Sequence, residues 1–218
     1  MQTKSEANTS ALVIEQLKRS KLKFTLENES LNDAISASLK KNLSKTGGKG
    51  GGRPDMQFAV QHKGTTWYGF IECKNSSDKM IKPDENGFIS NEKKTGELAW
   101  NAINGFAVNG AYYYAKNAYK DTEYKNWFII GACGTDEGSL KISVYVLTKD
   151  ETFGEAKHYK NFTDFSFLYP ENIKETLEEA GNACLSESEK EALRGEIRTI
   201  HRCGAYRTEP ENARRFQD

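Results

Sequence analysis

Cysteine and histidine are scarce in this chain, and neither residue type is clustered. The 218 residues contain three isolated histidines and four cysteines, and the cysteines are Cys73, Cys133, Cys184 and Cys203. A structural zinc site needs closely spaced cysteine or histidine ligands, and no Cys-x-x-Cys pair is present. The spacing therefore argues against a zinc site and favours free thiols in a reducing compartment.

Long apolar runs are also missing from the sequence. The apolar stretches are too short to cross a bilayer, and the N-terminal residues 1–8 lack the apolar segment of a signal peptide. Hydrophobic residues make up 37% of the chain and charged residues 28%, which predicts a modest core beneath a highly charged surface. We expect a cytoplasmic protein that does not associate with membranes.

Net charge is absent overall, but positive charge is concentrated in one segment. No acidic residue lies between Asp33 and Asp55, and the basic residues there are Lys40, Lys41, Lys45, Lys49 and Arg53. Glycines fill positions 47–52 except for Lys49, so this stretch can form neither a stable helix nor a packed strand. The segment favours phosphate contacts, with Lys45, Lys49 and Arg53 as DNA-binding residues. A solvated basic loop is the alternative.

Hydrophobic periodicity predicts alternating blocks of helix and strand. Helices are expected over residues 8–20, 30–43 and 97–119, and strands over residues 55–62, 66–73, 127–132 and 140–147. This order predicts an α/β fold in which a mixed central sheet of about four to five strands is flanked by helices. We assign residues 1–150 to this core. Residues 151–218 are interpreted as an aromatic cap followed by a charged helical extension or linker.

Two carboxylates and a lysine stand out at the predicted hairpin. Asp55 opens the first strand and Glu72 ends the second, so antiparallel pairing would bring both carboxylates to one end of the hairpin. Lys74 projects from the same face of its strand as Glu72. Asp55 and Glu72 could bind Mg²⁺, with the backbone carbonyl of Cys73 as a third ligand, and Lys74 could contact a phosphate. A surface aspartate beside an ordinary Glu–Lys pair is the simpler alternative.

The motif Pro54-Asp55 with Glu72-Cys73-Lys74 resembles the signature of the PD-(D/E)xK nuclease superfamily. With Ser44-Lys45, the glycine run and the helical segment 106–116, it resembles the N-terminal nuclease region of type I and type IIG restriction-modification enzymes, over about residues 28–148. The resemblance implies a restriction-endonuclease-like core. It also implies Asp55 and Glu72 as metal ligands, Lys74 as the catalytic lysine, and Mg²⁺ as cofactor with Mn²⁺ able to substitute.

The same resemblance implies accessory residues around this centre. Related nucleases often carry Gln-x-x-x-Tyr on the helix after the catalytic strand, and here Asn109 and Tyr113 occupy that place. Many relatives also supply an acid from the helix before Pro-Asp, for which Asp33 and Glu29 are the candidates. Ordinary helix packing is an alternative for Asn109 and Tyr113, and a charge at a helix N-terminus is an alternative for Asp33.

The expected function is that of a Mg²⁺-dependent DNA endonuclease in restriction-modification or phage defence. The expected partners are double-stranded DNA, a methyltransferase or specificity domain in the same or another chain, and a second copy that dimerises transiently on DNA. Neither a methyltransferase motif nor a helicase motif occurs in these 218 residues. A repair or recombination nuclease is one alternative, and a catalytically silent DNA-binding module with the same fold is another.

Overall fold

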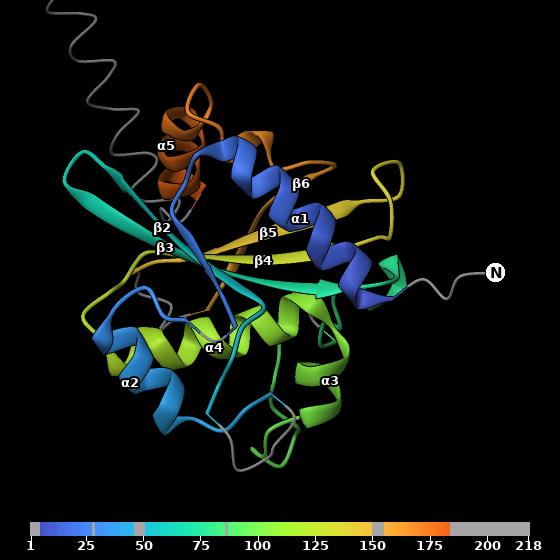
Figure 1. The fold of residues 1–218 in the computed structure, drawn as a ribbon. Helices are drawn as coiled ribbons and strands as arrows, with labels where there is room; N and C mark the ends of the chain where they lie inside the picture. Colours follow the sequence, from blue (N-terminus) through green and yellow to red (C-terminus); the bar gives the residue numbers. More distant parts are fainter. Residues whose placement is uncertain (1–4, 28, 46–50, 86, 150–154, 184–218) are drawn as a thin grey trace, which may run out of the picture. The chain divides into compact units, whose positions relative to one another are not determined.

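A six-stranded mixed sheet with helices on both faces forms the described part of the protein (Figure 1). The structure is a computed structural model and describes residues 5–27, 29–45, 51–85, 87–149 and 155–183. The strands are β1 (Phe24–Leu26), β2 (Met56–His62), β3 (Thr65–Lys74), β4 (Trp127–Cys133), β5 (Lys141–Leu147) and β6 (Lys157–Phe162). They lie in the sheet in sequence order, and β3 and β4 are parallel whereas the other neighbouring pairs are antiparallel.

The hairpin of β2 and β3 was predicted from its sequence and is present. Lys63 and Gly64 form its two-residue turn with φ angles of 48° and 78°. Positive φ at both positions is the backbone geometry of a type I′ turn, whose twist matches that of the flanking strands. The register pairs Met56, the first residue of β2, with Ile71, three residues before the end of β3.

Helices cover the two faces of the sheet unequally. On one face lie α1 (Glu6–Ser20), the short 3₁₀ helix η2 (Ser166–Leu168) and α5 (Ile173–Ala183). The other face carries α4 (Ala107–Asp121), against which α2 (Asp33–Lys41) and α3 (Trp100–Gly105) pack (Figure 1). Alternate residues of each strand point to opposite faces, so Ile71 and Phe70 belong to different apolar clusters. The long connection from β3 to β4 supplies the crossover that parallel strands require.

The predicted α/β fold, a mixed central sheet flanked by helices, is confirmed, and two details of its elements differ from the prediction. The sheet has six strands instead of four to five, because the three-residue β1 and the largely polar β6 carry too little apolar alternation to be recognised. The helix expected over 97–119 is two helices, since Phe106 between them has an extended backbone with φ −127° and ψ 136°. Gly105, a weak helix former, ends α3 at this break.

The predicted extension over 151–218 is partly described. Its β6 pairs with β5 in the central sheet, and α5 packs near β6 and η2. The charged helical extension expected within 151–218 agrees with α5 as far as Ala183, and the remainder lies outside the described residues. Within the described ranges, no helix combines the length and apolar character needed to cross a membrane.

Candidate active site

The β2–β3 hairpin brings Asp55 and Glu72 together. Asp55 immediately precedes β2, and its Oδ2 accepts a hydrogen bond of 2.8 Å from the backbone N–H of Cys73 on β3. Glu72 is fully buried beneath α4, at a point where the helix carries Gly110. A Cβ atom on Gly110 would lie 3.3 Å from Cγ of Glu72, so the missing side chain leaves room for the carboxylate.

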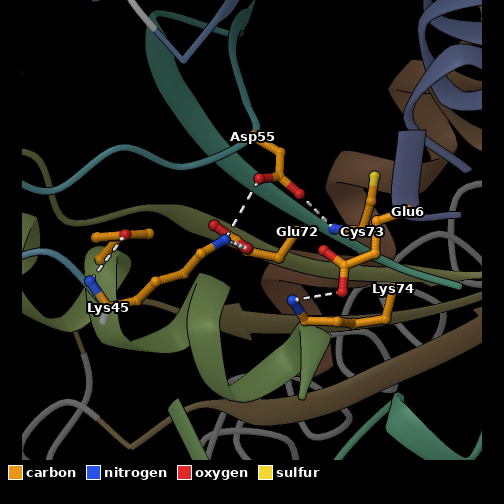
Figure 2. Close-up of polar contacts among 7 residues, drawn as sticks. Glu6, Lys45, Asp55, Glu72, Cys73 and Lys74 are labelled. Carbon is orange, nitrogen blue, oxygen red and sulfur yellow. Dashed lines mark hydrogen bonds and ion pairs between the residues drawn. The ribbon is translucent and has the colours of Figure 1, made fainter. Parts of the chain in front are cut away.

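Lys45 lies between these two carboxylates. Its ammonium group donates a hydrogen bond of 3.4 Å to Oδ1 of Asp55 and a closer one to Oε2 of Glu72 (Figure 2). The lysine side chain is only 17% exposed. Its backbone N–H donates to the hydroxyl oxygen of Tyr114 on α4 at 3.3 Å. The residue predicted from the sequence to contact phosphate thus neutralises the carboxylate pair in this structure.

Burial determines the electrostatics of this cluster. Burial raises the pKa of Glu72 to about 8, assisted by the nearby Asp55 carboxylate and opposed by Lys45. Burial alone would lower the pKa of the Lys45 ammonium, but the Glu72 and Asp55 carboxylates outweigh it and raise that pKa. Tyr114 is also affected, because burial and then Glu72 raise its pKa to about 12. Lys45 therefore carries a full positive charge in the cluster at neutral pH.

Lys74 is held by Glu6, an acid that the sequence did not indicate as part of the site. Its Nζ donates to Oε1 of Glu6 at 3.1 Å, and the lysine side chain is 7% exposed (Figure 2). The hydroxyl of Thr9 donates to the carbonyl oxygens of Lys74 at 3.2 Å and Gly134 at 2.5 Å. These bonds fix the first turn of α1 against the ends of β3 and β4. The helix predicted over residues 8–20 begins two residues after Glu6, so the sequence pattern did not indicate this acid as a partner of Lys74.

The predicted accessory residues occupy different surroundings. The Asn109 amide pairs with both backbone groups of Lys82, at 2.9 and 3.1 Å, and donates to Oδ1 of Asn91 at 3.0 Å. It therefore attaches Lys82 and Asn91 to α4. The Tyr113 hydroxyl donates to the carbonyl of Leu43 at 2.9 Å, two residues before Lys45. Asp33 lies exposed in the first turn of α2.

The remaining predicted DNA-binding residues, Lys49 and Arg53, precede Asp55 in the sequence. Arg53 is exposed, one residue before the buried Pro54, whereas Lys49 lies outside the described residues. The structure thus joins Lys45, Asp55 and Glu72 by direct contacts and places the Cys73 amide on Asp55. Lys74 follows on the same strand.

The oxygen atoms of this cluster suit a hard divalent cation. Oε1 of Glu72 is buried and accepts no hydrogen bond from the residues that the structure describes. Cys73 directs its N–H toward Asp55, and a strand residue directs its carbonyl to the same side. Extending the register places Pro54 opposite Cys73, and proline has no N–H to donate to that carbonyl.

This donor set is small. In the described part of the chain, no group of three or more histidine, cysteine, aspartate or glutamate side chains is placed to hold a metal ion. Mg²⁺ is commonly bound by one or two carboxylates and retains several waters, so two carboxylates and a carbonyl are compatible with it. The residues present therefore fit Mg²⁺ better than they fit a zinc ion.

Comparison of the chain with protein-family models, with curated proteins and with solved structures gave no match.

Proposed function

We propose that this chain is a Mg²⁺-dependent DNA endonuclease of the restriction-modification or phage-defence type, acting in the cytoplasm. One observation carries the proposal: two carboxylates from a hairpin converge on one cation, and an oxygen of the buried Glu72 has no hydrogen-bond donor among the described residues. A buried carboxylate beside a second one is costly unless it serves a charge-binding role. The PD-(D/E)xK-like motif, with Lys74 two residues after Glu72, gives this role its chemical direction.

In this proposal Asp55, Glu72 and the Cys73 carbonyl hold Mg²⁺, and Lys74 acts on the phosphate. The bound ion would supply Lewis-acid stabilisation of the charge that develops on the phosphate oxygens. Glu6 orients the Lys74 ammonium, which can donate to a phosphate oxygen or to the attacking water. The water oxygen bonds to phosphorus as the bond from phosphorus to the 3′-oxygen breaks. That oxygen takes up a proton, so the ends are a 5′-phosphate and a 3′-hydroxyl.

Double-stranded DNA is the proposed substrate. Lys45 contacts both carboxylates and the exposed Arg53 lies two residues before Asp55, so positive charge is available near the proposed metal site. Cleavage of both strands needs two such sites, which favours a transient dimer on DNA. Sequence recognition and methylation would come from a methyltransferase or specificity domain in the same or a partner chain.

The test is cleavage of a supercoiled plasmid in Mg²⁺ by the parent, three site variants and two control variants. Asp55→Asn, Glu72→Gln and Lys74→Met should each lower the cleavage rate by roughly a hundredfold or more, because each removes a charge that acts on the transition state. Glu85→Gln and Lys94→Met make the same charge changes in an exposed ion pair and should retain full activity.

Three results would contradict this assignment. Full activity in Asp55→Asn or Lys74→Met would remove these residues from the site. Degradation of linear but not circular DNA would indicate a repair or recombination nuclease that acts on free ends. DNA binding without cleavage by the parent in Mg²⁺ or Mn²⁺ would indicate a catalytically silent DNA-binding module.

A further inference from the structure

The position of Lys45 conflicts with the position required of a metal ion. Its ammonium group contacts one oxygen of Asp55 and one oxygen of Glu72, the same two carboxylates that the proposed Mg²⁺ site uses. The contact joins residues 27 positions apart, and the lysine side chain is mostly buried. It is therefore a built interaction and differs from the exposed ion pairs elsewhere on the surface, such as Lys94 with Glu85.

An ammonium group and a divalent cation cannot share this place. Both need direct contact with the Asp55 and Glu72 carboxylates, and two positive charges a few ångströms apart in a poorly hydrated site repel one another strongly. Without either cation, the Asp55 and Glu72 carboxylates would face each other unneutralised. In the metal-free protein, the Lys45 ammonium supplies the compensating positive charge through its contacts with both carboxylates.

We propose that Lys45 is a built-in competitor of the metal ion: its ammonium occupies the Asp55–Glu72 site without substrate and transfers to a DNA phosphate when the metal binds. This inference rests on the proposed function. A phosphate is the natural acceptor for the displaced ammonium, because Lys45 belongs to the basic segment that leads into Asp55. The two roles of Lys45, carboxylate partner and DNA contact, then belong to two states of one site.

Competition of this kind couples metal binding to DNA binding. Metal binding to the free protein must break the contacts of Lys45, whereas metal binding to the DNA complex need not. By linkage, DNA should tighten metal binding and metal should tighten DNA binding by the same factor. The protein would then avoid loading metal, and therefore avoid hydrolysis, until a phosphate backbone is in place.

The decisive experiment is calorimetric titration of Mn²⁺ into the full chain without DNA, at one fixed alkaline pH. Lys45→Met should bind Mn²⁺ at least roughly tenfold more tightly than the parent, because the competing charge is gone. Lys45→Arg keeps that charge and should stay close to the parent. Lys40→Met, a change of the same charge at an exposed position of α2, should also leave Mn²⁺ binding unchanged. Circular dichroism before each titration establishes that the variants are folded.

A second titration tests the DNA arm. In a Lys74→Met background, which retains both carboxylates, a mixed-sequence DNA duplex at low salt should tighten Mn²⁺ binding. Adding Lys45→Met should abolish most of that tightening, because the free protein already binds metal well. Equal Mn²⁺ affinity of the parent and Lys45→Met would overturn the competition while leaving the nuclease proposal intact. Absence of Mn²⁺ binding to every variant, with and without DNA, would overturn the proposed function and this inference together.

Discussion

Gly110 is the residue whose size most directly controls the position of Glu72. A Cβ atom there would lie 3.3 Å from Cγ of Glu72 and 3.1 Å from the carbonyl oxygen of Ile103. The backbone oxygen cannot move easily, so Gly110→Ala should displace the carboxylate instead. We expect plasmid cleavage in Mg²⁺ to fall roughly ten- to a hundredfold, since small misplacements of reacting groups carry penalties of this order.

Gly181→Ala is the control that separates displacement of Glu72 from a change in helix propensity. Gly181 lies in α5, and apart from its chain neighbours and its own helix backbone no described residue approaches within 4 Å of the Cβ that alanine would add there. Gly181→Ala should keep full activity and gain up to about 1 kcal/mol of stability, because alanine is the better helix former. Cleavage by Gly110→Ala at the parent rate would show that Glu72 tolerates the methyl group.

The residue scale also shows what sequence could and could not predict about the site. Asp55 meets Glu72 through a hairpin whose two-residue turn and alternating strands are local signals, so their proximity was predictable. The contact between Lys74 and Glu6 spans 68 residues and depends on how α1 docks across the sheet. The family resemblance implied Asp33 and Glu29 as candidate acids from the helix before Pro54-Asp55, whereas the acid that contacts Lys74 is Glu6, which the docking of α1 brings to the lysine.

At the scale of elements, Asp121 joins α2 to α4. Its carboxylate lies near the C-terminus of α4 and accepts hydrogen bonds from Ser38 at 3.0 Å, Lys41 at 2.6 Å and Asn42 at 2.8 Å. An acid is unfavourable at the negative end of a helix, so these donors compensate for its position. Because α2 leads directly to Lys45, this junction fixes where the basic segment begins.

Replacing Asp121 by asparagine should destabilise the protein in a pH-dependent way. Partial burial would raise the pKa of Asp121, but the hydrogen bonds from Lys41, Asn42 and Ser38 outweigh it and lower that pKa. A lowered folded-state pKa stabilises the fold above the ordinary value of about 4, and this contribution is lost as the pH falls through the lowered pKa. Urea unfolding should show Asp121→Asn to be about 1–2 kcal/mol less stable at pH 7. The difference should shrink below about pH 4. A difference that is constant with pH would indicate a packing effect.

The elements that sequence predicted well are those with strong apolar repetition. The four central strands were predicted almost to their bounds, because their buried residues are mostly aromatic or β-branched. The turn between β2 and β3 is marked in the sequence by Lys63-Gly64. Both edge strands were missed, since β1 has three residues and β6 is largely polar, with Tyr159 and Phe162 three positions apart instead of in a period-two alternation. The break at Phe106 was missed because the apolar helical spacing of α3 continues into α4, and no proline marks where one helix ends and the next begins.

At the scale of the whole molecule, the two apolar clusters share the same central strands. Trp67 and Phe128 belong to the cluster that α1 covers, whereas Phe70 and Trp127 belong to the cluster beneath α4. These residues alternate along β3 and β4, so neither face can lose its packing while the other keeps its strands in register. The site lies at the end of β3, and its Glu72 is part of the face beneath α4.

This shared construction predicts that both faces of the sheet unfold in one transition. Leu17→Ala on the α1 face should cost about 2–5 kcal/mol and Phe70→Ala on the α4 face about 3–5 kcal/mol, because both side chains are fully buried. Two proteins that retain a single tryptophan, Trp67 or Trp127, report on the two faces separately by fluorescence. Either substitution should shift the urea midpoint by the same amount in the protein that retains Trp67 and in the protein that retains Trp127. A substitution that moves only the tryptophan on its own face would mean that the two clusters unfold independently.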